Sequence, residues 1–410
     1  MQFIVEWEEN GHTFAELCRR FEVSRETGYK WVARFRELGM AGLEERSRAP
    51  HTRPHAMDEE MRRLVVELRG DHPSWGPKKL RELVVGRQSV GAVRPDLRVP
   101  APSTIGDLLS REGMIYRRRR KRGSVSPGTS GLFEADRPGA LWSIDYKGKF
   151  QTGNGIDCHP LTIMDNHSRK LLRLRAMEHI DQNQVRRDLE GAFGEFGLPD
   201  AIRSDNGTPF TTLAPGGLSE LSVWWMELGI RHERIDPGRP DQNGKHERMH
   251  LTLVRDCLDF GVEYDCRLQQ RRFARFMAEY NGVRPHEALE GMKTPDQTWG
   301  LGGGRAYTGR VPEMNYGAGF ESRRADHRGS VLCKGVWIGV TPVVAGHRLG
   351  LRENEDELHE VYFGEVFLGW LDWRERVFVS EQKAQSWADR AARAEARRVA
   401  REQTSAGPSE

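Results

Sequence analysis

The sequence predicts a multidomain protein with α-helical units at its N-terminus, a mixed α/β core and a small C-terminal β-barrel. A chain of 410 residues is too long for one ordinary hydrophobic core, so two to four domains are expected. Apolar residues recur at helical spacing in the first 111 residues, whereas short strand-like runs begin at Leu141. After Pro295 the chain is rich in glycine and then returns to short strand-like runs.

Residues 1–50 form the first predicted unit, a pair of short helices joined by a tight turn. Ser24 is a good N-cap for a helix that runs to Leu38, and its apolar face leaves a polar face outward. This is the geometry of a helix-turn-helix unit that enters the major groove of DNA. The candidate DNA contacts are Arg25, Thr27, Lys30 and Arg34. The alternative is a helical bundle without a ligand, and Gly28 costs the second helix about 1 kcal/mol relative to alanine.

Residues 56–116 form a second predicted unit of helix-turn-helix or winged-helix type. Residues 58–69 are amphipathic, Trp75 precedes a Gly-Pro helix start, and Ser103 can cap a helix over residues 104–111. The candidate DNA contacts in this unit are Lys78 and Lys79. The stretch between the two units is rich in Pro, Arg and His, which predicts a linker. Two such units in tandem favour extended contact with DNA.

The charge of the chain is unevenly distributed. The net charge is +3, but residues 1–130 hold 25 Lys and Arg against 18 Asp and Glu. The predicted basic linker, residues 117–135, begins with Arg117, Arg118, Arg119, Arg120, Lys121 and Arg122. A solvated linker is one interpretation of this run. Because the run adjoins the two helical units, we expect it to contact nucleic acid.

The cysteines and the hydropathy pattern predict where the protein works. The five cysteines are scattered, odd in number and never arranged as C-x-x-C, which argues against a disulfide framework and a structural zinc finger. A reducing cytoplasm fits this usage. No stretch approaches the ~20 consecutive apolar residues of a membrane span, and no signal-peptide pattern precedes the first helix. We therefore expect a cytoplasmic protein with no membrane partner.

Residues 136–296 form the predicted core. Strand-like runs at residues 141–150, 159–165 and 170–177 come first, and then a helix, a strand, a helix, a strand and a longer helix at residues 183–196, 201–205, 223–228, 232–235 and 242–258. Three strands followed by alternating helices and strands indicate a mixed α/β layer fold.

The predicted barrel spans residues 297–380, with strands at 336–340, 361–363 and 366–370. We expect its tryptophans, Trp337, Trp370 and Trp373, to lie mostly in its core. Residues 381–410 predict an exposed helix, rich in Ala, Arg and Glu up to residue 402, followed by a disordered tail.

Three acidic residues lie at informative positions in the core. Asp145 is in the first strand among apolar neighbours, where a carboxylate is costly unless something neutralises it. Asp205 ends a later strand just before an Asn-Gly turn, and Glu247 lies in the first turns of the helix that begins near residue 242. Singly, such an Asp is commonly a turn former, and such a Glu commonly stabilises the helix dipole. The three together indicate a common site.

Five segments carry a resemblance to a known family. They are LWSID at 141–145, DNHSR at 165–169, IRSDNGTPF at 202–210, PDQNGKHER at 240–248, and YNGVRPHEAL at 280–289 followed by Thr294-Pro295. Those that hold the three acids resemble the motifs of the retroviral-type integrase core, and the set is similar to bacterial insertion-sequence transposases of the DDE type. The likeness extends over most of the chain.

The resemblance implies an RNase H-like catalytic core in which Asp145, Asp205 and Glu247 bind two Mg²⁺ ions, with Mn²⁺ as a substitute. Two such ions about 3.5–4 Å apart activate the attacking oxygen and stabilise the leaving oxygen of a phosphoryl transfer. Mg²⁺ prefers a few carboxylates plus water and phosphate, so no histidine is required. The expected partners are double-stranded DNA at transposon ends and target. A homodimer or higher homo-oligomer is expected, because two ends must be paired.

The spacing of the third acid departs from this pattern. Forty-one residues separate Asp205 from Glu247, several more than the family leads us to expect. The surplus is a Pro/Gly loop at residues 212–218 that can bulge from the surface without disturbing either end. If it distorts the core instead, Asp241 and Glu233 are the nearest substitutes for Glu247.

Residues that flank the acids are candidate contacts to the DNA backbone. They are Asn206, Asn243, Lys245 and Arg248. Lys245 and Arg248 are three apart on a predicted helix, so they share a face and can grip phosphates. Ordinary surface charge is an equal interpretation.

Three other functions remain open. A catalytically inactive, sequence-specific DNA-binding regulator would have lost one of the three acids, and none is missing. A hydrolysis-only RNase H-like nuclease would not explain the tandem N-terminal units. A retroviral-style integrase would carry a zinc-binding N-terminal domain, but no His/His/Cys/Cys spacing precedes residue 141.

Overall fold

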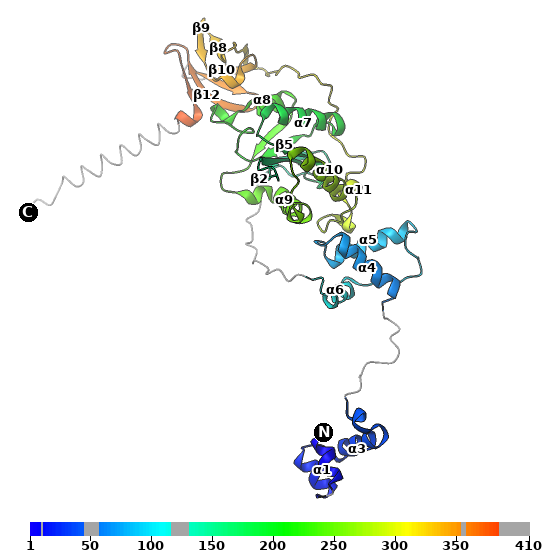
Figure 1. The fold of residues 1–410 in the computed structure, drawn as a ribbon. Coiled ribbons are helices and arrows are strands. Elements are labelled where there is room, and N and C mark those ends of the chain that lie inside the picture. Colours follow the sequence, from blue (N-terminus) through cyan, green and yellow to red (C-terminus); the bar gives the residue numbers. More distant parts are fainter. Residues whose placement is uncertain (10, 45–56, 116–130, 354–357, 385–410) are drawn as a thin grey trace, which may run out of the picture. The chain divides into compact units, whose positions relative to one another are not determined.

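The computed structural model describes residues 1–9, 11–44, 57–115, 131–353 and 358–384. The chain divides into two compact units, Met1–Met57 and Asp58–Glu410 (Figure 1). The predicted interdomain linker at 47–55, the basic run at 117–122 and the predicted C-terminal helix beyond residue 384 lie outside the described residues. In the described part of the chain, no helix combines the length and apolarity needed to cross a membrane.

The described residues of the first unit form three α-helices, and the last two are the pair that the sequence predicts. They are α1 (Gln2–Glu8), α2 (Phe14–Arg20) and α3 (Arg25–Leu38), and a 3-10 turn follows at Gly39–Leu43. The side chain of Ser24 accepts the backbone N–H of Thr27 at 3.1 Å, so the predicted N-cap is confirmed. Aromatic and aliphatic side chains from all three helices form the core of this unit.

Gly28 is buried where α3 meets the other two helices. A Cβ atom at this position would lie 2.9 Å from Sγ of Cys18 and 3.0 Å from the rings of Phe14 and Phe3. The low helix propensity of glycine is therefore offset by the close approach of the helices, which a larger residue would prevent.

The core of the second unit is a mixed sheet. Its strands are β1 (Leu141–Tyr146), β2 (Phe150–Gln151), β3 (Asp157–Asp165), β4 (Leu171–Met177), β5 (Ala201–Ser204) and β6 (Arg231–Arg234). β3 pairs antiparallel with β1, β2 and β4, whereas β1–β5 and β5–β6 are parallel. Because β1 and β5 are parallel neighbours, their carboxyl ends lie at the same edge of the sheet.

Helices cover both faces of this sheet. They are α7 (Gln182–Phe196), α8 (Glu220–Glu227), α9 (Gly244–Asp256), α10 (Cys266–Gly282) and the short α11 (Pro295–Trp299). Trp142 and Ile144 of β1 belong to the hydrophobic cluster that α7 and α8 complete. A separate cluster joins α9 and α10 to β3 and β4. Since side chains alternate along a strand, Ser143 and Asp145 lie on the α9 face.

The second helical part precedes this core. It contains α4 (Glu59–Asp71), α5 (Pro77–Ser89) and α6 (Pro102–Arg111). The expectation that Ser103 caps α6 was wrong, because the helix begins at Pro102 and its N-cap is Ala101, without a side-chain cap bond. Proline presets the helical φ angle at the first helical position, so it starts the helix one residue ahead of Ser103.

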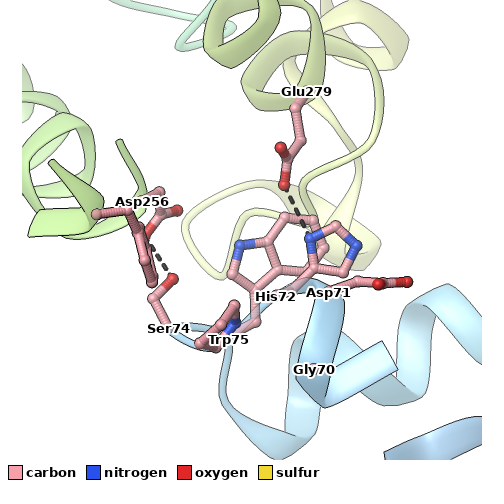
Figure 2. Close-up of a pocket in the computed structure, with 9 residues that line it drawn as sticks. Gly70, Asp71, His72, Ser74, Trp75, Asp256 and Glu279 are labelled. Carbon is pink, nitrogen blue, oxygen red and sulfur yellow. Dashed lines mark hydrogen bonds and ion pairs between the residues drawn. The ribbon is translucent and has the colours of Figure 1, made fainter. Parts of the chain in front are cut away.

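The turn between α4 and α5 contacts the ends of α9 and α10. A pocket of about 250 Å³ lies there. Figure 2 shows His72 directed toward Glu279 and Ser74 directed toward Asp256. His72 Nδ1 lies 2.8 Å from a Glu279 carboxylate oxygen, and the Ser74 hydroxyl donates to Asp256 at 2.5 Å. The buried ring of Trp75 stacks on His72. These contacts attach the second helical part to the α9–α10 side of the core.

The C-terminal part is a set of antiparallel strands. They are β7 (Glu321–Arg324), β8 (Ser330–Cys333), β9 (Val336–Gly339), β10 (Arg348–Glu353), β11 (His359–Phe363), β12 (Val366–Asp372) and β13 (Val377–Ser380). Five pair in the order β13-β12-β11-β10-β7, and β8 pairs with β9. Within the described residues β13 and β7 are the ends of the five-stranded sheet, so closure into the predicted barrel is not confirmed.

Trp337 does not lie in the core of this part, contrary to our expectation. Its exposed fraction is 55 %, because β9 belongs to the two-stranded sheet and directs Ile338, not Trp337, inward. Trp370 is half-buried, and Trp373 packs against the hydrophobic cluster of the C-terminal sheet.

The loop at residues 212–218 does not simply bulge from the surface. Leu213 is fully exposed, but Leu218 is buried in the hydrophobic cluster of the C-terminal sheet. A Cβ atom at Gly216 would lie 2.7 Å from Cγ1 of Val366 on β12. The added loop therefore packs the C-terminal sheet against the core.

Candidate metal centre

Asp145 lies near the carboxyl end of β1, half-buried on the face that α9 covers. The backbone N–H of Tyr146 donates to its Oδ1 at 2.8 Å. Burial and the negative charges of Asp205 and Glu247 raise the pKa of Asp145 to about 7, against the opposing effect of the Tyr146 hydrogen bond. Both other acids are therefore close enough to act on Asp145 electrostatically.

Asp205 follows directly after β5, beside the end of β1. Its Oδ1 accepts the backbone N–H of Gly207 at 3.0 Å, which fixes the carboxylate in the Asn-Gly turn. A Cβ atom at Gly207 would lie 3.0 Å from Oδ2 of Asp205. A side chain at position 207 would therefore require the Asp205 carboxylate to shift slightly.

Glu247 lies in the first turn of α9, and its side chain is exposed. The two acids considered as substitutes for Glu247 form ion pairs with arginine residues. Glu233 is buried and pairs with Arg203 at 2.7 Å, and Asp241 pairs with Arg239 at 2.9 Å. Among the described residues, no arginine pairs with Glu247 as Arg203 and Arg239 pair with these two acids, and the charge of Glu247 acts on Asp145.

Two histidines of α9, which the sequence analysis missed, adjoin Asp145. Potential ligand atoms of Asp145, His246 and His250 lie within 4.8 Å of one another, an arrangement that can hold a metal ion. His250 is three residues beyond Glu247, so the two side chains share a helix face. That spacing is the signal from which the sequence could have indicated His250.

The residues at this edge fit the divalent cation that the resemblance implies. A carboxyl group whose pKa is raised to about 7 by burial and by two neighbouring acids is costly to ionise without a cation. Carboxylate oxygens with one or two imidazole nitrogens form a donor set that Mg²⁺ or Mn²⁺ can occupy.

The candidate DNA contacts of the helical parts differ in accessibility. Arg25 and Lys30 are exposed on α3, whereas Thr27 and Arg34 are half-buried. The hydroxyl groups of Thr27 and Ser24 are hydrogen-bonded at 2.9 Å. In α5, Lys78 is exposed, but Lys79 forms an ion pair with Glu287 of the core at 2.7 Å.

The candidate contacts around the acids are also unequal. Asn206 is exposed, and its amide nitrogen donates to the backbone oxygen of Ile235 at 2.6 Å. Asn243 is buried, whereas Arg248 is exposed on α9. The amino group of Lys245 donates to the backbone oxygen of Asn166 at 3.4 Å. Lys245 and Arg248 are both exposed.

Four families of protein domains match this chain. The integrase core domain matches residues 135–240, and a second integrase core family matches residues 228–295. The chain has an integrase core. A helix-turn-helix domain matches residues 2–51, and a homeodomain-like domain matches residues 27–109. The helix-turn-helix character of the N-terminal helices and the integrase-like core are thereby confirmed.

Relatives of this integrase-core protein occur in bacterial insertion elements. It is 24 % identical over 320 residues to the 39.2 kDa protein of insertion element IS476 from Xanthomonas euvesicatoria, covering 77 % of this chain and 82 % of the relative. It is 27 % identical over 238 residues to the 31.7 kDa protein of insertion element IS407 from Burkholderia multivorans, covering 58 % and 80 %. The resemblance to insertion-sequence transposases with an integrase core is confirmed.

Solved structures of retroviral integrases also match. One is the HTLV-2 integrase catalytic core domain in complex with magnesium, which is 16 % identical in sequence to this chain. The match covers 40 % of this chain and 99 % of that domain, with a TM-score of 0.32.

Proposed function

We propose that this chain is a DNA transposase that binds the terminal repeats of its element, cleaves at the ends and joins the exposed 3′-hydroxyls to target DNA. The observation that carries the proposal is the position of three carboxylates in an integrase core: one near the end of β1, one directly after β5 and one in the first turn of α9. The charges of Asp205 and Glu247 both act on Asp145, at the edge where β1 and β5 end. Asp145, Asp205 and Glu247 are the proposed metal ligands.

The proposed reaction uses one site twice. In the first step a water oxygen attacks the phosphorus at the transposon end, the P–O3′ bond breaks, and the 3′-oxygen leaves as a hydroxyl. In the second step that hydroxyl attacks a phosphorus of the target DNA, and a second P–O3′ bond breaks. Two divalent cations, when bound, stabilise the attacking and leaving oxygens of such displacements. Mg²⁺ is the proposed ion and Mn²⁺ its substitute.

The residues of this chain have defined parts in that scheme. Asp145 and Asp205 are held by backbone N–H groups, from Tyr146 and Gly207 respectively, and so offer fixed oxygens. Glu247 is exposed on α9 and adds a third carboxylate from the solvent side. Arg248, also exposed on α9, is the proposed contact to the DNA backbone next to the acids. Lys245, Asn206 and Asn243 remain candidates for the same role.

DNA recognition is proposed for the N-terminal parts. The proposed boundaries are residues 1–50, 56–116 and the linker 117–135 for DNA binding, 136–296 for catalysis, and 297–380 and 381–410 for the C-terminal parts. Arg25, Lys30 and Lys78 are the exposed contacts on α3 and α5. The protein would act as a homodimer or larger homo-oligomer at the bacterial nucleoid, because two transposon ends must be held together.

Labelled terminal-repeat DNA, incubated with the full chain, target DNA and Mg²⁺, tests the proposal. Joined products support a transposase, nicks alone indicate a hydrolysis-only nuclease, and a mobility shift alone indicates a regulator. We expect Asp205→Asn to abolish cleavage and joining while end binding stays near the wild-type level. The matched control is Asp200→Asn, which changes a carboxylate at the other end of β5 and should leave joining unchanged. Retained cleavage in Asp205→Asn would contradict the site assignment.

A further inference from the structure

A hydroxyl group connects the two histidines of α9 to the strand that carries Asp145. Thr162 of β3 is the antiparallel partner of Asp145. Its Oγ1 lies 2.9 Å from the backbone oxygen of Asp145, 2.6 Å from Nε2 of His246 and 2.8 Å from Nε2 of His250. One side-chain oxygen thus takes part in three hydrogen bonds.

The hydrogen atoms of this network can be assigned by counting. A hydroxyl group has one proton to donate and two lone pairs that accept. The backbone oxygen of Asp145 can only accept, so the Thr162 proton goes to it. Both imidazoles must then donate their Nε2–H protons to Thr162, and this assignment satisfies all three contacts. In each neutral ring, Nδ1 consequently carries a lone pair.

The two Nδ1 atoms have different surroundings. Nδ1 of His246 lies 2.6 Å from the hydroxyl of Ser143, which donates to it, so both nitrogens of this buried ring are used in hydrogen bonds. Nδ1 of His250 lies 3.8 Å from Oδ2 of Asp145. Although His246 is part of the same cluster, only His250 directs an unshared lone pair toward the Asp145 carboxylate.

The separation of these two atoms suits a shared cation. Two metal–ligand bonds of about 2.1 Å each span at most about 4.2 Å, so atoms 3.8 Å apart can bind one ion. A direct hydrogen bond between them would require a shorter distance.

We propose that Nδ1 of His250 is a fourth protein ligand of the metal centre and binds the ion that Asp145 binds. The inference rests on the proposed function only in taking Asp145 as a metal ligand. Thr162 orients the ring by accepting its Nε2–H, as the partners of metal-bound histidines commonly do. An imidazole nitrogen in a set of carboxylates favours Mn²⁺ over Mg²⁺. The chain therefore binds Mn²⁺ more tightly than an all-carboxylate site would.

The test is the electron spin-echo signal of Mn²⁺ bound to the full chain, prepared without a histidine tag. A nitrogen ligand produces a ¹⁴N coupling in this signal, which a purely structural histidine would not. We expect the coupling in the wild-type protein and its loss in His250→Gln. The glutamine amide can still donate to Thr162 from the position of Nε2, but it has no atom equivalent to Nδ1. We also expect the Mn²⁺ affinity of this variant to fall about tenfold or more, and its Mg²⁺ affinity to fall less.

The matched control is His159→Gln. His159 lies on the same strand as Thr162, three positions away and therefore on the other face of the sheet, and its change should leave the ¹⁴N coupling intact. Absence of coupling in the wild-type protein, or its persistence in His250→Gln, would overturn the proposal. DNA joining, assayed on the same preparations, separates the two hypotheses. If the ¹⁴N coupling is present but no DNA is joined, His250 is a metal ligand and the proposed transposase function is wrong. If DNA is joined in an Asp205-dependent way but no ¹⁴N coupling is seen, the transposase function holds and His250 is not a ligand.

Discussion

Arg203 of β5 and Glu233 of β6 form a buried ion pair, with 2.7 Å between Nη2 and Oε2. The same guanidinium donates to the backbone oxygens of Gln242 and Phe133, and the carboxylate accepts the N–H of Phe133. This pair therefore ties the strand that ends at Asp205 to the segment that leads into α9 and Glu247. It fixes the spacing between two of the three acids.

Breaking this pair should be strongly destabilising. Glu233→Ala leaves a buried guanidinium without its partner, and we expect the free energy of unfolding to fall by about 3–5 kcal/mol. Urea denaturation measures it. Removing the exposed pair of Arg94 and Asp96 is the control and should leave the free energy of unfolding nearly unchanged, because water screens an exposed ion pair. In the double variant Arg203→Ala/Glu233→Ala the loss should be smaller than the sum of the single losses, and additive losses would contradict the coupling.

Gly28→Ala tests the close packing of α3. Helix propensity alone predicts a gain of about 1 kcal/mol, but the new methyl group would crowd Cys18, Phe14 and Phe3. We expect a net loss of about 1–3 kcal/mol, measured as reduced hydrogen-exchange protection of α3. Gly86→Ala is the control, because Gly86 lies exposed in α5 with no atom within 4 Å of an added Cβ. It should raise the protection of α5, and a stabilised α3 in Gly28→Ala would show that the packing tolerates the methyl group.

Asp145→Asn should stabilise the metal-free protein at alkaline pH. The pKa of Asp145 is raised to about 7, so the folded state loses stability as pH rises from about 4 through 7, where the unfolded state is already ionised. Asparagine removes this charge and keeps an oxygen for the Tyr146 N–H. With EDTA at pH 8, we expect a gain of about 1 kcal/mol or more in the free energy of unfolding.

Addition of Mg²⁺ should make the wild-type protein more stable to unfolding than Asp145→Asn, the reverse of the order expected with EDTA. The cation stabilises the folded wild-type protein by mass action, and Asp145→Asn should gain less. Equal stabilisation of both by Mg²⁺ would mean that Asp145 does not bind the ion.

Two half-buried histidines predict acid sensitivity of the second unit. Burial lowers the pKa of His232 and of His286 to about 3 each. Unfolding exposes them to water, where they take up protons near pH 6.5, so stability is full above that pH and falls as the pH drops from 6.5 toward 3. Each contributes at most about 1.4 kcal/mol per pH unit, measurable by urea denaturation at several pH values. His286→Gln should reduce this slope, while replacement of the exposed His179 should not.

Local sequence patterns predicted much of the fold. Ser24 fixed the start of α3, and the start of α6 differs from the predicted one by only two residues. The motifs around Asp145, Asp205 and Glu247 predicted an integrase core through their resemblance to a known family, whereas the strand, turn and helix starts were predicted from a few neighbouring residues. The same motifs made the three carboxylates the candidate metal ligands, before any spatial relation was known.

The sequence by itself determined the helix-turn-helix units, the order of strands and helices, and the acids at their ends, since caps, turns and hydrophobic periodicity are local. Only the tertiary structure decided the rest. In the tertiary structure the loop at residues 212–218 packs against β12, and Trp337 is exposed. Glu233 forms an ion pair with Arg203, and Nδ1 of His250 lies 3.8 Å from the Asp145 carboxylate. Each of these depends on which distant segments share a surface, and hydrophobic packing and hydrogen-bond pairing across the whole chain set that choice.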